Sequence, residues 1–104
     1  MLRTAVAMLF VHQFFVSVAD EVPRFDLTSN CRGQATNAPT SFGDCMRDEN
    51  KARGALVAQW SRFSPVDRAN CTRETEVYLP SYVDLLTCLE IARDTGKLKS
   101  DAIQ

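Results

Sequence analysis

Three carboxylates lie close together in the sequence, at Asp44, Asp48 and Glu49. Two such groups can act as general acid and general base when burial drives their pKa values apart. That chemistry needs a cleft, and a chain of 104 residues has little room for one. Arg47 and Lys51 are interleaved with the carboxylates, which is typical of a solvated helix face. We therefore favour a surface role for these residues, and a small carboxylate-dependent enzyme is the alternative.

The apolar segment at the N-terminus is typical of a signal peptide. Arg3 supplies a positive charge, residues 4–18 are mostly apolar, and Ala19 provides a small residue before Asp20. We expect cleavage after Ala19, which predicts a periplasmic or secreted protein. A membrane-spanning helix needs about 20 apolar residues, so we expect no stable membrane span after cleavage. Retention of residues 4–18 as a membrane anchor is the alternative.

Cleavage at this position would also remove His12, the one histidine in the chain. Histidine is the side chain that titrates near neutral pH without special tuning. Without it, the Ser-His-Asp and Cys-His catalytic arrangements and the histidine-containing zinc sites cannot form. We therefore expect a protein that is not an enzyme and that holds no cofactor and no metal.

Four cysteines remain in the expected mature chain, at Cys31, Cys45, Cys71 and Cys88. An even number of cysteines in a short exported chain predicts two disulfides. The alternative of a structural metal site needs ligands that pair at short spacing, and the sequence contains no Cys-x-x-Cys. The same observation argues against a thiol redox enzyme.

The pattern Ser-x-x-Asp occurs three times ahead of a run with helical periodicity, and each copy predicts the start of a helix. The serine hydroxyl can accept a hydrogen bond from a first-turn amide, and the aspartate lies near the positive end of the helix dipole. The three copies begin at Ser41, Ser64 and Ser81. They predict helices over residues 42–63, 65–74 and 82–95. Gly96 is the expected left-handed cap residue after the last helix.

Outside these helices the sequence is irregular or polar. Residues 20–40 show no sustained periodicity and are rich in Ser, Thr, Asn and Gly, so we expect an irregular arm. Residues 97–104 are expected to form a polar tail. The predicted organisation is a signal peptide (1–19), the arm (20–40), a helical disulfide domain (41–96) and the tail (97–104).

Apolar stripes on the two longer helices predict a small all-α domain of three helices, stabilised by disulfides and preceded by the irregular arm. The stripe of the first helix contains Cys45, Ala52, Leu56, Trp60 and Phe63. The stripe of the last helix contains Tyr82, Leu85, Leu86, Cys88, Leu89 and Ala92. Glu49 is expected on the opposite, solvated face, where Arg53 lies one turn away. Trp60 and Phe63 are expected in the core, and an interaction hot spot is the alternative.

Helix geometry favours one of the three possible disulfide pairings. If the first two helices form an antiparallel hairpin, Cys45 lies ~27 Å from the turn and Cys71 only ~9 Å from it. That difference exceeds the reach of a disulfide. Across the second turn, Cys71 and Cys88 differ in height by only ~5 Å. We therefore favour Cys71 with Cys88 and Cys31 with Cys45, and the other two pairings stay open.

Tyr78, Leu79 and Tyr82 belong to an apolar segment that as a whole fits no helix face, although Tyr82 also lies on the stripe of the last helix. Pro80 separates the helices on either side of the segment. Because aromatic anchors dominate protein interfaces, these three residues are the best candidates for partner binding if they are exposed. We expect the partner to be a protein or a cell-wall component whose identity the sequence does not give. The formal net charge of −1 argues against a nucleic-acid partner.

Several of these residues also carry a resemblance to known proteins. Residues 31–93 resemble a group of short exported proteobacterial proteins that have four cysteines and no assigned function. The matching segments are Cys45–Glu49, Ala52–Arg53, Leu56, Trp60–Phe63, Asp67–Cys71, Pro80–Val83 and Leu85–Glu90. The resemblance implies a periplasmic location and no particular chemistry.

A looser resemblance is to the LprI-type periplasmic lysozyme-inhibitor family. It is carried by the adjacent Gln59 and Trp60, followed by Phe63 and Arg68. The resemblance implies helical hairpins and inhibition of lysozyme. Our favoured interpretation is an exported, non-catalytic binding or structural module of the cell envelope, and a lysozyme-inhibitor-like protein is the alternative.

Overall fold

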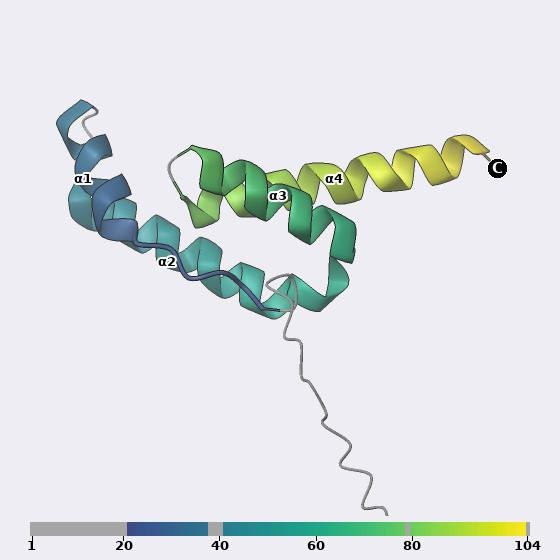
Figure 1. The fold of residues 1–104 in the computed structure, drawn as a ribbon, viewed down its shortest axis with the longest axis horizontal. Coiled ribbons are helices and arrows are strands. Elements are labelled where there is room, and N and C mark those ends of the chain that lie inside the picture. The colour runs from purple at the N-terminus through teal and green to yellow at the C-terminus, as the bar shows by residue number, and fades with distance from the viewer. Residues whose placement is uncertain (1–20, 38–40, 79, 104) are drawn as a thin grey trace, which may run out of the picture.

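The part of the chain that the structure describes is mainly helical. The computed structural model describes residues 21–37, 41–78 and 80–103. In order, the helices are α1 (Leu27–Asn37), α2 (Phe42–Gln59), the 3₁₀ turn η2 (Trp60–Arg62), α3 (Pro65–Val77) and α4 (Tyr82–Ile103) (Figure 1). The described residues contain no strand. The expected all-α fold is therefore confirmed, with a fourth helix in addition to the three predicted ones.

Serine caps define the starts of α2, α3 and α4, as the repeated sequence pattern predicts. The hydroxyl of Ser41 accepts a hydrogen bond from the amide of Asp44 at 3.0 Å. The equivalent distances are 3.1 Å from Asp67 to Ser64 and 3.2 Å from Asp84 to Ser81. Each cap pairs an amide that has no partner within its own helix.

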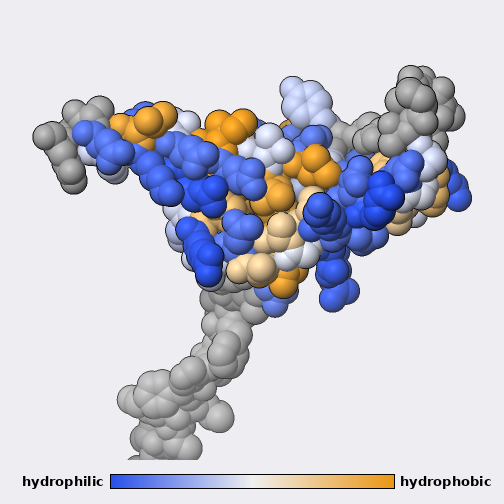
Figure 2. Space-filling model, turned by 180° about the vertical axis from the view of Figure 1, so that it is seen from behind, coloured by the Kyte–Doolittle hydropathy of each residue, from blue (hydrophilic) through white to orange (hydrophobic). Residues whose placement is uncertain are grey.

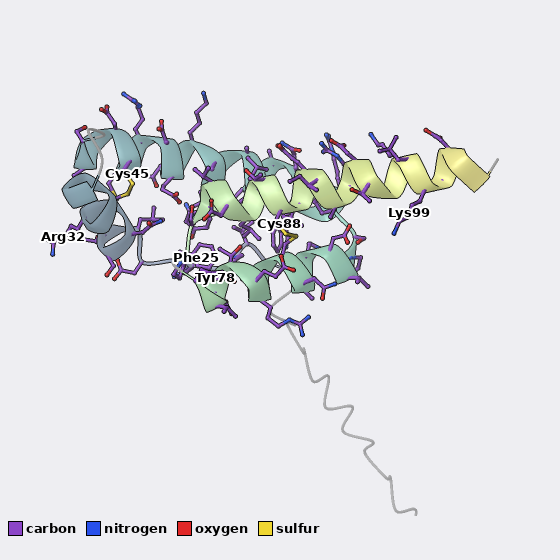
Figure 3. All side chains as sticks on the ribbon, turned by 90° about the horizontal axis from the view of Figure 1, so that it is seen from above. Phe25, Arg32, Cys45, Tyr78, Cys88 and Lys99 are labelled. Carbon is purple, nitrogen blue, oxygen red and sulfur yellow. A yellow bond between two sulfur atoms is a disulfide. The ribbon has the colours of Figure 1, made fainter. Side chains whose placement is uncertain are left out.

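The four helices form an inner pair and two outer helices. α2 and α4 pack against each other, α1 packs on α2, and α3 packs on α4. In Figure 1, α1 lies beside the beginning of α2, and α3 lies alongside α4. Each outer helix is joined to its inner neighbour by one disulfide, Cys31–Cys45 for α1 and Cys71–Cys88 for α3 (Figure 3). Both favoured pairings are thus confirmed.

The apolar core lies between the inner pair and the corner that follows α2. Trp60 and Phe63, which form this corner, are buried in the core as expected. The buried residues of the cluster are Leu27, Ala52, Leu56, Trp60, Phe63, Cys71, Tyr82, Leu85 and Leu89. Val22 and Phe25 from the segment before α1 pack against this cluster. Residues 21–26 therefore cover the core although they form no regular element.

The expected irregular arm contains a helix, and this part of the prediction is wrong. α1 buries Leu27, Asn30 and Cys31, which lie on one face at helical spacing. Its first turn is supported by Asp26, whose carboxylate accepts a hydrogen bond from the amide of Thr28 at 3.0 Å. The polar composition concealed the helix because a disulfide, rather than a broad apolar stripe, fixes α1 to α2.

The end of the last helix was also predicted wrongly. α4 continues through Gly96 to Ile103, so most of the expected polar tail is helical. None of the described glycines has a positive φ, and Gly96 therefore does not form a left-handed cap. A glycine weakens a helix by about 1 kcal/mol without ending it, and lysine and leucine follow here as good helix formers. α3 likewise extends to Val77, three residues beyond the predicted end at residue 74.

Replacing Gly96 with alanine is expected to stabilise the protein by about 0.5 kcal/mol. The new methyl group meets nothing within 4 Å, and alanine loses less backbone freedom than glycine when the helix forms. Urea denaturation followed by circular dichroism measures the change. Gly54→Ala in the middle of α2 is the matched control, because its Cβ also enters open space. Destabilisation by Gly96→Ala alone would contradict a continuous α4.

Candidate functional site at the turn between α3 and α4

The three residues predicted to bind a partner have different environments. Tyr78 follows the last residue of α3 and is 81% exposed, and its neighbour Val77 is 74% exposed. Tyr82 is only 2% exposed. Leu79 lies outside the described residues. The exposure on which this prediction depends is therefore found at Tyr78 and not at Tyr82, and partner binding by Tyr78 stays a prediction.

Tyr82 is buried because it connects α4 to the segment before α1. Its hydroxyl donates a hydrogen bond to the carbonyl of Pro23 at 2.7 Å and accepts one from the amide of Phe25 at 3.0 Å. The rings of Phe25 and Tyr82 lie with their centroids 4.8 Å apart. A buried tyrosine usually finds such polar partners for its hydroxyl. Tyr82 is therefore a structural residue that holds residues 21–26 over the core.

The residues that lead into α4 are held in place from the buried side by two further helices. The side-chain amide of Asn30 in α1 donates a hydrogen bond to the carbonyl of Pro80 at 3.2 Å. The carboxylate of Glu49 in α2 accepts hydrogen bonds from the hydroxyl of Ser81 at 2.6 Å and from the amide of Tyr82 at 2.7 Å. Residues distant in the sequence thus fix the start of α4. Tyr78 projects from α3 close to this fixed region (Figure 3).

A shallow pocket of about 230 Å³ lies beside Tyr78. It is lined by Glu74, Thr75, Tyr78, Asp84 and Cys88. The Cys71–Cys88 disulfide fixes the two helices that form its walls. A carboxylate oxygen of Glu74 lies 3.6 Å from Sγ of Cys88. The pocket therefore combines an exposed aromatic ring, two carboxylates and a disulfide sulfur on one fixed frame.

Neither carboxylate of this pocket has a cationic partner among the described residues. The ion pairs found there are Arg47 with Asp44, Arg47 with Asp48, and Arg93 with Asp94. Glu74 and Asp84 are both exposed, so their charges remain solvated. The polar group of Thr75 is already used, because its hydroxyl donates to the carbonyl of Cys71 at 2.8 Å. The available chemistry of the pocket is thus negative charge beside an aromatic ring.

The sequence did not single out Glu74 and Asp84, although a signal was present. Glu74 lies one turn before Tyr78, and Asp84 lies one turn before Cys88. Once Cys71 is joined to Cys88, these positions fall on the same side of the disulfide. The disulfide pairing and the helical spacing together are thus sufficient to predict that Glu74 and Asp84 lie close to Tyr78.

The three carboxylates considered for catalysis do not share a site. Asp44 and Asp48 lie on the surface of α2 on either side of Arg47, which contacts them at 3.3 and 3.7 Å. Glu49 is buried on the opposite side of the helix at 3% exposure. Its expected place on the solvated face, one turn from Arg53, is therefore wrong. The structure separates the three candidates into a surface ion-pair group, Asp44 and Asp48 with Arg47, and a structural carboxylate, Glu49.

The residues that carry the resemblance to the lysozyme-inhibitor family form the corner between α2 and α3. The guanidinium of Arg68 lies over the Trp60 ring at 5.7 Å from its centroid, and that of Arg93 lies 5.6 Å from the centroid of Phe63. Arg93 also donates a hydrogen bond to the side chain of Gln59 at 3.5 Å. Such cation–π contacts stabilise the corner. These residues are accounted for by packing.

A larger hollow of about 510 Å³ lies where the start of α3 faces the second half of α4. Its charged residues are Arg62, Asp67, Arg93, Lys97 and Asp101. Cations and anions alternate there, so the hollow has no single charge character. Phe63, its one aromatic wall residue, is buried in the core. The pocket beside Tyr78 has the more distinct chemistry.

Comparisons with known proteins add no relative. No family model matches the chain, and neither the curated proteins nor the solved structures yield a match. Within residues 21–37, 41–78 and 80–103, no helix is both long and apolar enough to span a membrane. All four cysteines are in disulfides, which is typical of proteins that fold in an oxidising compartment.

Proposed function

We propose that this protein is an exported binding module of the cell envelope, acting without catalysis through the surface around Tyr78. The proposal is supported by an exposed tyrosine that lies beside a pocket. The two helices that form this pocket, α3 and α4, are joined by a disulfide. Tyrosine is enriched among the residues that dominate binding energy at protein interfaces. The ring of Tyr78 and the neighbouring Val77 are both largely exposed, so a partner that covered them would remove apolar surface from water.

The fixed frame supports this proposal energetically. Binding costs less when the contact residues are already ordered, because little conformational freedom is lost on association. Here the Cys71–Cys88 disulfide, the cap at Ser81 and the bond from Asn30 to Pro80 order the backbone on both sides of the turn. In Figure 2, apolar side chains appear as separate patches among hydrophilic ones on the face shown. The proposed binding surface is therefore defined by the particular residues beside the turn.

Location in the periplasm or outside the cell is part of the same proposal. The two disulfides support it, because such bonds persist mainly in oxidising compartments. The expected signal peptide, residues 1–19, lies outside the described residues. Intact-mass measurement on protein from the envelope fraction tests this part, and a chain starting at Asp20 with four fewer hydrogens than its reduced form is expected. A chain that still begins at Met1 would contradict cleavage.

Site-specific crosslinking in living cells tests the binding surface. With p-benzoylphenylalanine in place of Tyr78, we expect a discrete adduct, because a bound partner would lie within reach of the probe. The matched control carries the probe at Val66, which is exposed near the start of α3 and therefore lies at the far end of that helix from the turn. The partner identified from the adduct by mass spectrometry is then purified for binding measurements.

The purified partner should bind the wild-type protein and lose at least about tenfold in affinity with Tyr78→Ala, since a central aromatic contact is worth roughly 1–2 kcal/mol or more. Val66→Ala should leave the affinity unchanged. Equal adducts from both probe positions, or no loss with Tyr78→Ala, would contradict a binding surface at this turn.

A further inference from the structure

We propose that the pocket beside Tyr78 receives a lysine or arginine side chain of a protein partner. This inference rests on the proposed binding function and specifies the chemistry of the partner. It is carried by the charge and shape of the pocket formed by α3 and α4. Glu74 and Asp84 supply two negative charges, Tyr78 supplies an aromatic ring, and the Cys88 sulfur supplies an apolar wall.

The two carboxylates favour a cation over any other occupant. Both line one pocket, and no basic side chain in the described part of the chain forms an ion pair with either of them. A neutral apolar side chain in this place would remove water from the carboxylates without replacing its hydrogen bonds. An anion would meet charges of its own sign. An ammonium or guanidinium group supplies both the opposite charge and the missing donors.

The positive end of α4 does not reverse this preference. An unsatisfied helix start can attract an anion through its free amides. Here the amide of Tyr82 donates to Glu49, and the amide of Asp84 donates to the hydroxyl of Ser81. The amide of Leu85 donates to the carbonyl of Ser81 at 3.0 Å. Three first-turn donors are therefore occupied within the protein itself.

Tyr78 and the disulfide distinguish a basic side chain from a bare cation. A guanidinium or ammonium group gains energy over the face of an aromatic ring, and its aliphatic stem needs an apolar surface. The exposed ring of Tyr78 and the sulfur of Cys88 provide these two surfaces in the same pocket as the carboxylates. A hydrated metal ion would use the carboxylates and gain little from the ring. The combination therefore fits a basic residue of a protein.

Selection of peptides from a random display library on the immobilised, oxidised protein tests this inference. We expect the sequences recovered on the wild-type protein to be enriched in lysine or arginine relative to the starting library. Selection on Glu74→Gln/Asp84→Asn should lose this enrichment, because both negative charges are gone. Glu76→Gln is the matched control, since Glu76 is an exposed carboxylate on the same helix that does not line the pocket.

Affinity measurements on one selected peptide make the test quantitative. Replacing its arginine with citrulline, a neutral analogue of the same shape, or its lysine with norleucine should weaken binding to the wild-type protein by roughly tenfold. The same replacement should change binding to Glu74→Gln/Asp84→Asn by less than about twofold. Circular dichroism shows whether that variant is folded, and Glu74→Gln alone serves if it is not.

The possible outcomes separate this inference from the proposed function. Peptides that require Tyr78 but show no basic enrichment would overturn the inference and leave the binding function standing. Failure to select any peptide that depends on Tyr78 would count against both. Binding of calcium ions alone, with loss in Glu74→Gln/Asp84→Asn but not in Tyr78→Ala, would replace the basic residue with a metal ion and overturn the inference.

Discussion

Replacement of both Cys71 and Cys88 by alanine will detach α3 from α4 and lower the free energy of unfolding by about 3 kcal/mol. The two residues are 17 positions apart, and a disulfide across such a loop restricts the unfolded chain by about that amount. The loss is expected to concentrate in α3, because little else holds this helix in place. Urea denaturation measures the global change, and amide hydrogen exchange locates it.

α3 contributes very little apolar surface to the core. Cys71 is its one buried apolar side chain, whereas Val66 and Val77 are exposed. Its other buried side chains, Thr72 and Thr75, are polar, and the hydroxyl of Thr72 is buried without a hydrogen-bond partner. A helix with so narrow an apolar face gains little from packing. We therefore expect the amides of α3 to lose protection before those of α2 and α4.

Replacing Cys31 and Cys45 with alanine provides the comparison. This pair, 14 positions apart, closes a loop of similar length, so the entropic part of the loss is again about 3 kcal/mol. α1 retains the buried Leu27 and the bond from Asn30 to Pro80. Its amides should therefore lose less protection than those of α3 do in the other variant. Equal protection of α3 and α4 without Cys71–Cys88 would show that side-chain packing holds α3.

The helix starts and the disulfide pairing were predictable because each depends on local geometry. A serine three residues before an aspartate caps the helix that follows it, because its hydroxyl accepts a hydrogen bond from the amide of that aspartate. This bond needs no residue from elsewhere in the chain. The pairing of Cys71 with Cys88 follows from the rise per residue of two adjacent helices. Tyr78 was singled out because it fits no helix face, and the structure exposes it.

The features that were missed depend on contacts between distant residues. α1 has a polar sequence and is fixed by a disulfide and by the bond from Asn30 to Pro80. Tyr82 belongs both to the stripe of the last helix and to the apolar segment around Pro80. The sequence does not decide between the two, because the partners of Tyr82, Pro23 and Phe25, come from the far end of the chain. The prediction of a cap at Gly96 rests on residue type alone. In each case a tertiary contact or a continuing helix outweighed the local signal.

Glu49 shows most clearly how residue type can mislead. It lies four residues after Cys45 and three before Ala52, so helical periodicity places it within the buried stripe of α2. Its charge suggested the solvated face instead. In the structure, the carboxylate occupies the buried position because it completes the cap of α4, where helix-dipole charge and two donors stabilise it.

Replacing Glu49 with alanine is therefore expected to lower the free energy of unfolding by about 3 kcal/mol. The change leaves the hydroxyl of Ser81 and the amide of Tyr82 without their acceptor in a buried place, at roughly 1–3 kcal/mol for each unsatisfied group. It also removes a negative charge from the start of α4, which is worth about 0.3–1 kcal/mol. Water can partly enter the space left by the Glu49 side chain and bind the two donors, so the expected loss of stability is smaller than the sum of these contributions at their upper values.

Asp48→Ala is the matched control, because Asp48 is the adjacent carboxylate on the same helix but is exposed. Its loss should change the stability by no more than about 0.5 kcal/mol. Glu49→Gln should be intermediate, since the amide oxygen can still accept from Tyr82 while the charge is lost. Urea denaturation of the oxidised proteins measures all three variants. Equal stability of the two alanine variants would show that water replaces the Glu49 carboxylate at the start of α4 without cost. The buried carboxylate would then not hold α2 and α4 together.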